Sequence, residues 1–162
     1  MPRPWLDVAH LWVLKQGMAL NLVKLCVGAD SIQDLRDWVA ERALSAIAAG
    51  LEPHSVHTTR MVPKRVDELL AEGSLYWVIK GQVMARQKLL GIETFTGGDG
   101  IGRCHLVLGP EVIETLPQPR RPFQGWRYLT PEDAPADLGS LGEDVMALPE
   151  DLRRELAELG LL

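Results

Sequence analysis

The segment from His54 to Arg60 holds the residues with the clearest capacity for chemistry. His54 and His57 stand three positions apart, and two imidazoles at this spacing reach one metal ion if the segment is helical. No Cys or Glu at a matching distance completes a ligand set, so we expect no metal and no other cofactor. The two histidines are weak candidates for a catalytic base, and their alternative role is structural hydrogen bonding in a loop.

A basic helix start is predicted after these histidines. Pro63 is typical of the first turn of a helix and Gly73 of the position just past its end, so a short helix is expected between them. Amides at a helix N-terminus attract anions, and Arg60, Lys64 and Arg65 add positive charge there. We therefore expect these three side chains to contact a phosphate or carboxylate group.

The segment from Pro119 to Tyr128 combines arginines with aromatic rings. Guanidinium groups bind phosphate and exposed rings stack on bases, so the segment is a candidate nucleic-acid surface. The alternative is a structural clamp, in which Phe123 and Trp126 pack on a sheet and the arginines face water. The predicted ligand-binding residues are Arg60, Lys64, Arg65, Arg103, Trp126, Arg127 and Tyr128.

Two further motifs carry weaker signals. The segment Gly97–Gly102 is rich in glycine, but it lacks the lysine of a phosphate loop and precedes a run typical of a strand. It therefore favours a β-turn between two strands. Cys104 and His105 are neighbours on the second of these strands, so their side chains point to opposite faces and form no obvious catalytic pair. A buried, structural Cys104 is the expected outcome.

Composition excludes several classes of protein. The chain has 162 residues, of which 46% are hydrophobic and 24% are charged, and its mean hydropathy is -0.01, as in ordinary globular domains. Its longest apolar runs are far shorter than the roughly 20 residues of a membrane-spanning helix. The presence of only two cysteines favours a reduced, cytoplasmic setting.

The net charge of -5 is unevenly distributed along the chain. Residues 1–53 carry a net charge of -1, residues 54–128 carry +3, and residues 129–162 carry -7. The acidity is therefore mostly a property of the C-terminal end. The basic middle is compatible with a nucleic-acid partner.

Hydrophobic periodicity and turn residues predict an α+β fold. The expected elements are a strand at 19–27, a helix at 31–50, a short helix at 63–72, a strand at 74–80, extended segments at 82–90 and 92–95, a strand at 101–108 and a helix at 149–159. Prolines from Pro117 onward predict an irregular connecting arm. We expect a mostly antiparallel sheet or small open barrel with two covering helices and a peripheral C-terminal helix.

One domain is expected, with an extension at each end. Residues 1–17 lack the pattern of a secretory signal and are predicted to be a peripheral N-terminal extension. Residues 18–137 form the α+β domain, and residues 138–162 form an acidic arm and helix.

Several long motifs, in order along the chain, resemble one known family. They are Leu22–Gly28, His57–Arg65, Gly73–Gly81, Asp99–Arg103 and Phe123–Leu129. Together they resemble an uncharacterised proteobacterial family, number 1489 among the domains of unknown function, over about residues 18–137. The layout of helices, strands and arm is also loosely similar to PUA-like and ASCH-like barrels, which bind RNA or modified nucleotides. That similarity is an analogy, because none of their signature motifs is present.

The leading hypothesis is a cytoplasmic, non-catalytic domain that binds RNA or a nucleotide-like anion, away from membranes. The first alternative is a small enzyme acting on a phosphorylated or carboxylate substrate, with His54 or His57 as general base and Arg60 as anion clamp. The second alternative is a protein-interaction module whose acidic tail binds a basic partner. The sequence does not decide among these three or give the oligomeric state.

Overall fold

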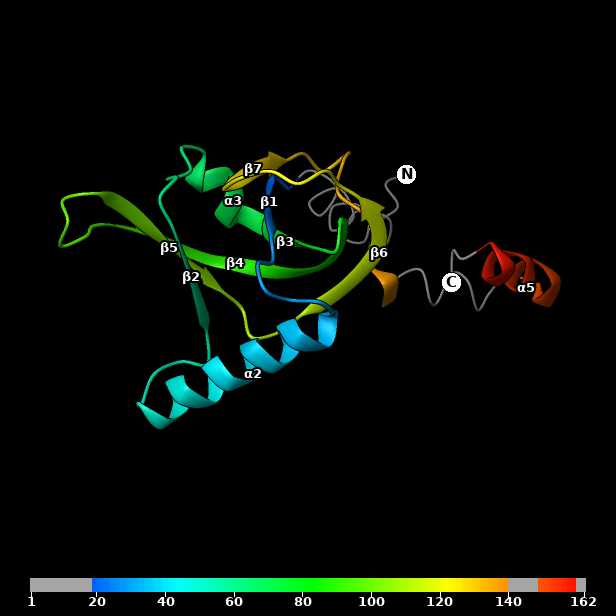
Figure 1. The fold of residues 1–162 in the computed structure, drawn as a ribbon, viewed down its shortest axis with the longest axis horizontal. Coiled ribbons are helices and arrows are strands. Elements are labelled where there is room, and N and C mark those ends of the chain that lie inside the picture. Colours follow the sequence, from blue (N-terminus) through cyan, green and yellow to red (C-terminus); the bar gives the residue numbers. More distant parts are fainter. Residues whose placement is uncertain (1–18, 140–148, 160–162) are drawn as a thin grey trace, which may run out of the picture.

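A curved sheet with two helices packed against it forms the body of the protein (Figure 1). The structure is a computed structural model that describes residues 19–139 and 149–159. Its elements are β1 (Asn21–Leu25), α2 (Ile32–Ala48), β2 (Ser55–Thr59), α3 (Val66–Glu72), β3 (Ser74–Ile79), β4 (Gln82–Thr96), β5 (Gly102–Leu108), β6 (Ile113–Pro119), β7 (Trp126–Leu129) and α5 (Glu150–Glu158). This is the α+β fold that the sequence predicts.

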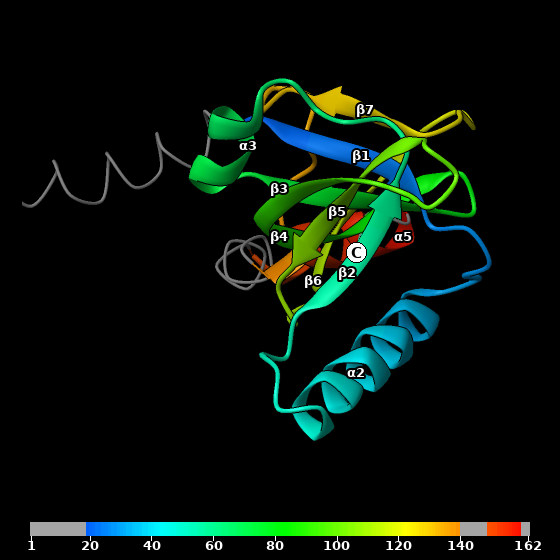
Figure 2. The same ribbon diagram turned by 90° about the vertical axis from the view of Figure 1, so that its left-hand side faces the viewer.

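The sheet is open and mostly antiparallel. Its seven strands follow the order β2-β5-β4-β3-β1-β7, and β6 pairs with β4 off this path. Among the described strands, only β1 and β3 run parallel to each other. The first half of β4 pairs with β3 and β6 and its second half pairs with β5, so this long strand joins two parts of the sheet (Figures 1 and 2).

A tight turn at Lys80 and Gly81 joins β3 to β4. Lys80 and Gly81 have φ angles of 51° and 78°, as the two central residues of a type I′ hairpin turn require. The β4 strand then continues without interruption, where the sequence pattern indicates two extended segments. Its register against β5 shifts between Leu89 and Gly91, and such a shift bends a strand.

The main core lies on one face of the sheet, between the strands and both helices. Strand β5 shows the predicted alternation, with Cys104, Leu106 and Leu108 buried and the intervening residues partly exposed. A second, smaller cluster lies on the opposite face and consists of Val23, Tyr76, Val78, Val83 and Leu129. Strands β1 and β3 are therefore covered on both faces, as the apolar run at 19–27 indicates.

Helix α2 begins as predicted but covers less of the sheet than expected. Ser31 is its N-cap, and the Ser31 hydroxyl accepts a hydrogen bond from the Asp34 amide at 3.2 Å. Leu35 and Val39 are buried, whereas Ile47, which the helical spacing assigns to the same face, is 57% exposed. The helix contacts the sheet over its first half and extends away from it over the second (Figure 2).

Helix α3 begins at Val66, three residues later than its proline predicts. Gly73 follows it in extended backbone, with a φ angle of -77°. A Cβ atom at this position would lie 2.3 Å from the carbonyl oxygens of both Leu20 and Leu69. Glycine is therefore required here because the backbone segments approach closely. The reason is not a left-handed turn, since the φ angle is negative.

Three strands lie in segments that the sequence pattern does not assign to strands. Strand β2 occupies the predicted histidine loop, and β7 occupies the predicted irregular arm. Strand β6 contains Pro117 and ends at Pro119, and it has β4 as its partner among the described strands. Prolines are tolerated in such edge strands, where fewer amides must donate.

The two ends of the chain are only partly described. Helix α5 confirms the predicted C-terminal helix. The predictions for residues 1–17 and for residues 140–148 of the acidic arm lie outside the described residues.

Candidate functional site

Residues 60–65, here called the basic loop, cross strand β7 and are anchored to it. The Nε1 atom of Trp126 donates a hydrogen bond to the Met61 carbonyl oxygen at 2.7 Å. Trp126 is only 6% exposed and belongs to the main core. The stacking role expected for Trp126 requires an exposed ring, whereas this indole is enclosed and fixes the loop.

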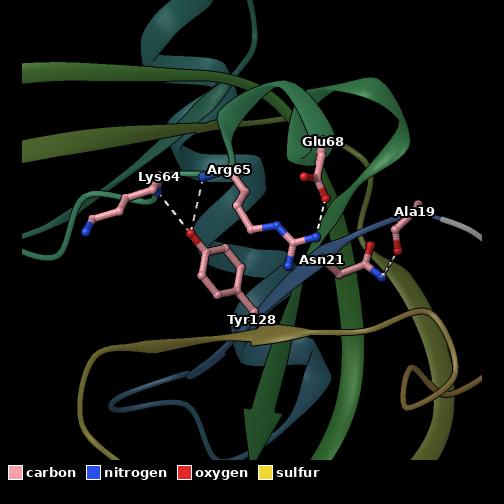
Figure 3. A network of polar contacts seen from close by, with 6 residues as sticks. All are labelled: Ala19, Asn21, Lys64, Arg65, Glu68 and Tyr128. Atoms are coloured by element: carbon pink, nitrogen blue, oxygen red, sulfur yellow. Dashed lines mark hydrogen bonds and ion pairs between the residues drawn. The ribbon is translucent and has the colours of Figure 1, made fainter.

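Tyr128 holds the next part of the basic loop (Figure 3). Its hydroxyl oxygen accepts hydrogen bonds from the backbone amides of Lys64 at 2.9 Å and Arg65 at 3.3 Å. These two amides precede the first residue of α3, Val66, and Tyr128 already satisfies them. The Tyr128 ring is also partly covered, because the Arg65 guanidinium lies 5.7 Å from its centroid. Side chains, not backbone amides, are left to bind a ligand at this position.

The cationic side chains of the basic loop differ in their contacts. Arg65 forms an ion pair with Glu68 on α3 (Figure 3), and exposed pairs of this kind stabilise little. Arg60 and Lys64 are exposed, and within the described ranges neither side chain has an acidic partner. Two cations on a fixed loop are therefore available to an anion from solution.

Two of the three arginines of the 119–128 segment contact a ring of their own segment. The guanidinium groups of Arg120 and Arg127 lie 5.5 and 5.3 Å from the centroid of Phe123. Arg127 also donates to the carbonyl oxygens of Gln124 and Trp126 at 2.8 and 2.9 Å. Because alternate residues of a strand point to opposite faces, Arg127 does not share a face with Trp126 and Tyr128. The buried Trp126 agrees with the clamp hypothesis, whereas two of the arginines lie against Phe123, which that hypothesis does not include.

Arg103 stabilises the glycine-rich hairpin between β4 and β5. Its guanidinium donates two hydrogen bonds to the Asp99 carboxylate, at 2.9 and 2.6 Å. This pairing, together with the Ile101 amide, holds the pKa of Asp99 far below its ordinary value. The predicted β-turn is thus confirmed, and Arg103 fixes its geometry.

The strand register brings Arg103 close to the end of β2. Thr59, the last residue of β2, pairs with Cys104, so Arg60, the first residue of the basic loop, and Arg103 on β5 each stand one position beyond this pair. Two of the predicted ligand-binding residues, far apart in sequence, therefore lie at adjacent backbone positions.

An aromatic pair lies next to Arg103, and the predicted ligand-binding residues do not include it. Phe95 is opposite Arg103 in the register and stacks on His105, with 4.4 Å between ring centroids and 27° between planes. Thr58 is opposite His105 in the register, and its hydroxyl oxygen lies 2.9 Å from the Nδ1 atom of His105. We call the surface formed by Thr58, Phe95, Arg103 and His105 the outer strand face. Its signal in the sequence is the alternation of 101–108, which places Arg103 and His105 on one face.

The two predicted histidines lie in different settings. His54 precedes β2, whereas His57 lies within β2 and packs edge-on against Trp77 at 5.4 Å. The Nε2 atom of His57 is buried and has no hydrogen-bond partner. Burial, and then the charges of Lys24 and Arg42, lower the pKa of His57 to about 4. His57 is therefore neutral at neutral pH and enclosed, whereas Arg60, the proposed anion clamp, is exposed beyond the end of β2.

Lys24 and Arg42 are basic residues near His57 that the predicted ligand set omits. Both influence the His57 imidazole electrostatically, Lys24 from β1 and Arg42 from α2. Lys24 is half-buried, and burial lowers its pKa. Its signal in the sequence is its position inside the otherwise apolar run at 19–27.

The described residues offer neither a metal site nor an exposed thiol. Within residues 19–139 and 149–159, no three His, Cys, Asp or Glu side chains gather where they could hold a metal ion. Cys26 and Cys104 are buried, unpaired thiols, and burial raises the pKa of each. No helix in the described part of the chain is long and apolar enough to cross a membrane.

Comparisons with known proteins identify the family of the chain without assigning an activity. Searches of curated proteins and of solved structures found no match, so the PUA-like similarity stays an analogy of layout. A model of one protein family, described as a protein of unknown function (DUF1489), matches residues 22–162. The match includes the C-terminal segment, which lies beyond the motifs that carry the resemblance. The chain belongs to this family, domain of unknown function 1489.

Proposed function

We propose that this protein is a non-catalytic domain that binds single-stranded RNA on its outer strand face. The observation that carries the proposal is the stacked pair of Phe95 and His105, of which Phe95 keeps 36% of its surface exposed. RNA-binding sheets use such rings as platforms for unstacked bases.

The platform is held in place before any ligand arrives. His105 supports one side of the Phe95 ring and is itself positioned against Thr58. The neighbouring Arg103 is fixed by two hydrogen bonds to Asp99. A ring that is already ordered loses little conformational freedom when a base stacks on it.

Phosphate contacts are assigned to the basic loop. Arg60 directly follows Thr59, the last β2 residue in register with β5, and Lys64 extends the same loop, whose backbone is anchored to Trp126 and Tyr128. Free cations at fixed positions suit the phosphate backbone, which contributes affinity independent of sequence. Trp126 and Arg127, which contact other parts of the protein, have structural roles in this proposal.

A binding role is favoured over catalysis by the state of His57. Its imidazole is neutral and its Nε2 atom is enclosed, whereas an efficient general base has a pKa near the working pH. The free thiols are buried, so neither is an exposed nucleophile.

The electrostatic part of the proposal is tested by the salt dependence of binding. Fluorescence anisotropy of a labelled oligouridine of about twelve nucleotides is measured at several salt concentrations. We expect the double variant Arg60→Gln and Lys64→Gln to reduce the slope of log K against log salt by about 1.4, or about 0.7 for each lost contact. The control double variant, Arg36→Gln and Lys80→Gln, removes equal charge elsewhere and is expected to leave the slope unchanged.

The stacking part is tested by Phe95→Leu. This variant is expected to weaken RNA binding by about 1–3 kcal/mol while the salt slope is retained, because only a base contact is lost. The control is Leu90→Ala, which truncates an exposed apolar residue of the same strand. Absence of RNA binding by the wild type at low salt, or equal loss in both variants, contradicts the proposal.

A further inference from the structure

A group of basic side chains lies on the core face of the sheet, at the end nearest α2. Lys24 of β1 is opposite Trp77 of β3 and Trp126 of β7. Both indoles belong to the main core together with Leu22, two residues before Lys24. Because residues two apart in a strand share a face, the Lys24 side chain extends toward the core between two tryptophans.

His57 completes one side of this group. It packs against Trp77, the indole opposite Lys24, with a nearly perpendicular interplanar angle of 87°. Its Nε2 atom has neither solvent nor a protein partner. A buried nitrogen without a hydrogen bond costs free energy, and in native proteins it usually signals a missing partner.

An open hollow adjoins the same group. It has a volume of about 500 Å³ and is lined by Val27, Trp38, Glu41, Arg42 and Ser45. Arg42 therefore lines the hollow and also acts on His57. Trp38, 36% exposed, contributes a flat apolar wall.

The positive charges of this group are not neutralised by the protein. Glu41 is the carboxylate among the lining residues, yet neither Arg42 nor Lys24 forms an ion pair with it or with any other acid of the described chain. Asp34 acts electrostatically on the nearby Cys26 thiol but is likewise unpaired with these cations. Arg42 is exposed, whereas Lys24 is half-buried, and a half-buried cation without a partner is costly unless a counter-charge joins it.

We propose that Lys24, Arg42 and His57 form a binding site for the oxyanion of a small molecule, a phosphate or carboxylate group. Lys24 and Arg42 supply the positive charge, and the Nε2 atom of His57, which has no partner in the protein, supplies the hydrogen bond. The remainder of such a molecule lies in the hollow against Trp38. This site uses residues separate from the RNA surface and is independent of it.

The site is tested with inorganic phosphate and acetate as probes, by calorimetry on the full chain at constant ionic strength. At least one probe is expected to bind, and the preferred probe identifies the oxyanion as phosphate or carboxylate. Lys24→Met and Arg42→Gln are each expected to weaken binding about tenfold or more, because each removes a charge-assisted contact. Arg36→Gln, on the same helix but paired with Glu114, is the matched control and is expected to bind as the wild type does.

A second readout needs no variant of the binding residues. A bound anion favours the charged imidazole, so saturating probe is expected to raise the pKa of His57 measured by NMR. The double variant of Arg60 and Lys64 should bind the probe normally, which separates this site from the RNA surface. If neither probe binds at millimolar concentration, or if Lys24→Met and Arg42→Gln bind as the wild type does, the proposal is wrong.

Discussion

The anchored side of the molecule, around the basic loop and β7, contrasts with the side near α2. On the anchored side, the Trp126 indole and the amides of Lys64 and Arg65 all have hydrogen-bond partners. Near α2, the Nε2 atom of His57 has none, and the second half of the helix exposes Leu44 and Ile47.

This difference separates structural polar groups from candidate functional ones. Satisfied groups stabilise the fold, as the Trp126 contact to the basic loop does. Unsatisfied basic groups reduce stability unless a ligand completes them. A conspicuous sequence motif, such as the 119–128 segment, can therefore be structural, while an inconspicuous lysine in an apolar strand lies at a candidate site.

The largest effect is expected for loss of the Trp126 anchor. Trp126→Ala removes a buried indole and its hydrogen bond to Met61, and should lower the free energy of unfolding by about 3–5 kcal/mol. Trp38→Ala truncates the partly exposed tryptophan of α2 and is expected to lower the free energy of unfolding much less. Urea denaturation followed by circular dichroism measures both variants. Equal losses would remove the contrast between the two sides.

A smaller effect is expected when only the hydroxyl of Tyr128 is removed. Tyr128→Phe removes the acceptor of the Lys64 and Arg65 amides, which are exposed and can bond to water instead, and should lower the free energy of unfolding by about 0.5–1.5 kcal/mol. Hydrogen exchange at these two amides is expected to accelerate, while exchange at the buried strand β3 should follow only the global change in stability. Unchanged exchange at both amides would show that Tyr128 does not hold the basic loop.

The third prediction concerns His57, on the side near α2, and the pH dependence of the free energy of unfolding. The pKa of His57 is about 4 in the folded chain and near 6.5 when unfolded, so above pH 6.5 the imidazole is neutral in both states. As the pH falls from 6.5 toward 4, the unfolded chain gains a proton that the folded chain does not, and the free energy of unfolding decreases.

His57→Leu should flatten this pH dependence and leave stability at pH 7.5 equal or higher, because an unsatisfied buried nitrogen is removed. The matched control is His54→Leu, which is expected to keep the wild-type pH profile. Urea titrations at pH 7.5, 6, 5 and 4 measure all three proteins. A steep pH dependence that survives in His57→Leu would assign the effect to other groups.

Local signals in the sequence predict much of this fold. The start of the helix expected at 31–50, the β-turn in Gly97–Gly102 and the strand expected at 101–108 each depend on neighbouring residues, and each is confirmed. Strands β2 and β7 are not predicted because they are short and their own sequences give a weak strand signal. Pairing with β5 and β1 stabilises their extended backbone.

The candidate site is less predictable, because it depends on contacts between distant segments. Arg60 and Arg103 are both named from the sequence, yet their proximity follows from the pairing of β2 with β5. The sequence also cannot tell that the Trp126 ring faces the core or that Phe95 stacks on His105. Such outcomes depend on which strands pair, and the partners β2 and β5, or β1 and β7, are far apart in the sequence.

An NMR titration of the ¹⁵N-labelled full chain with oligouridine tests the proposed function most directly. We expect the largest amide shifts at Phe95, Arg103, His105 and the basic loop, with little change around Lys24 and Arg42. Phosphate added alone should produce the converse pattern, because the two sites are separate. RNA-induced shifts confined to the α2 side, or no shifts at low salt, would contradict RNA binding by the outer strand face.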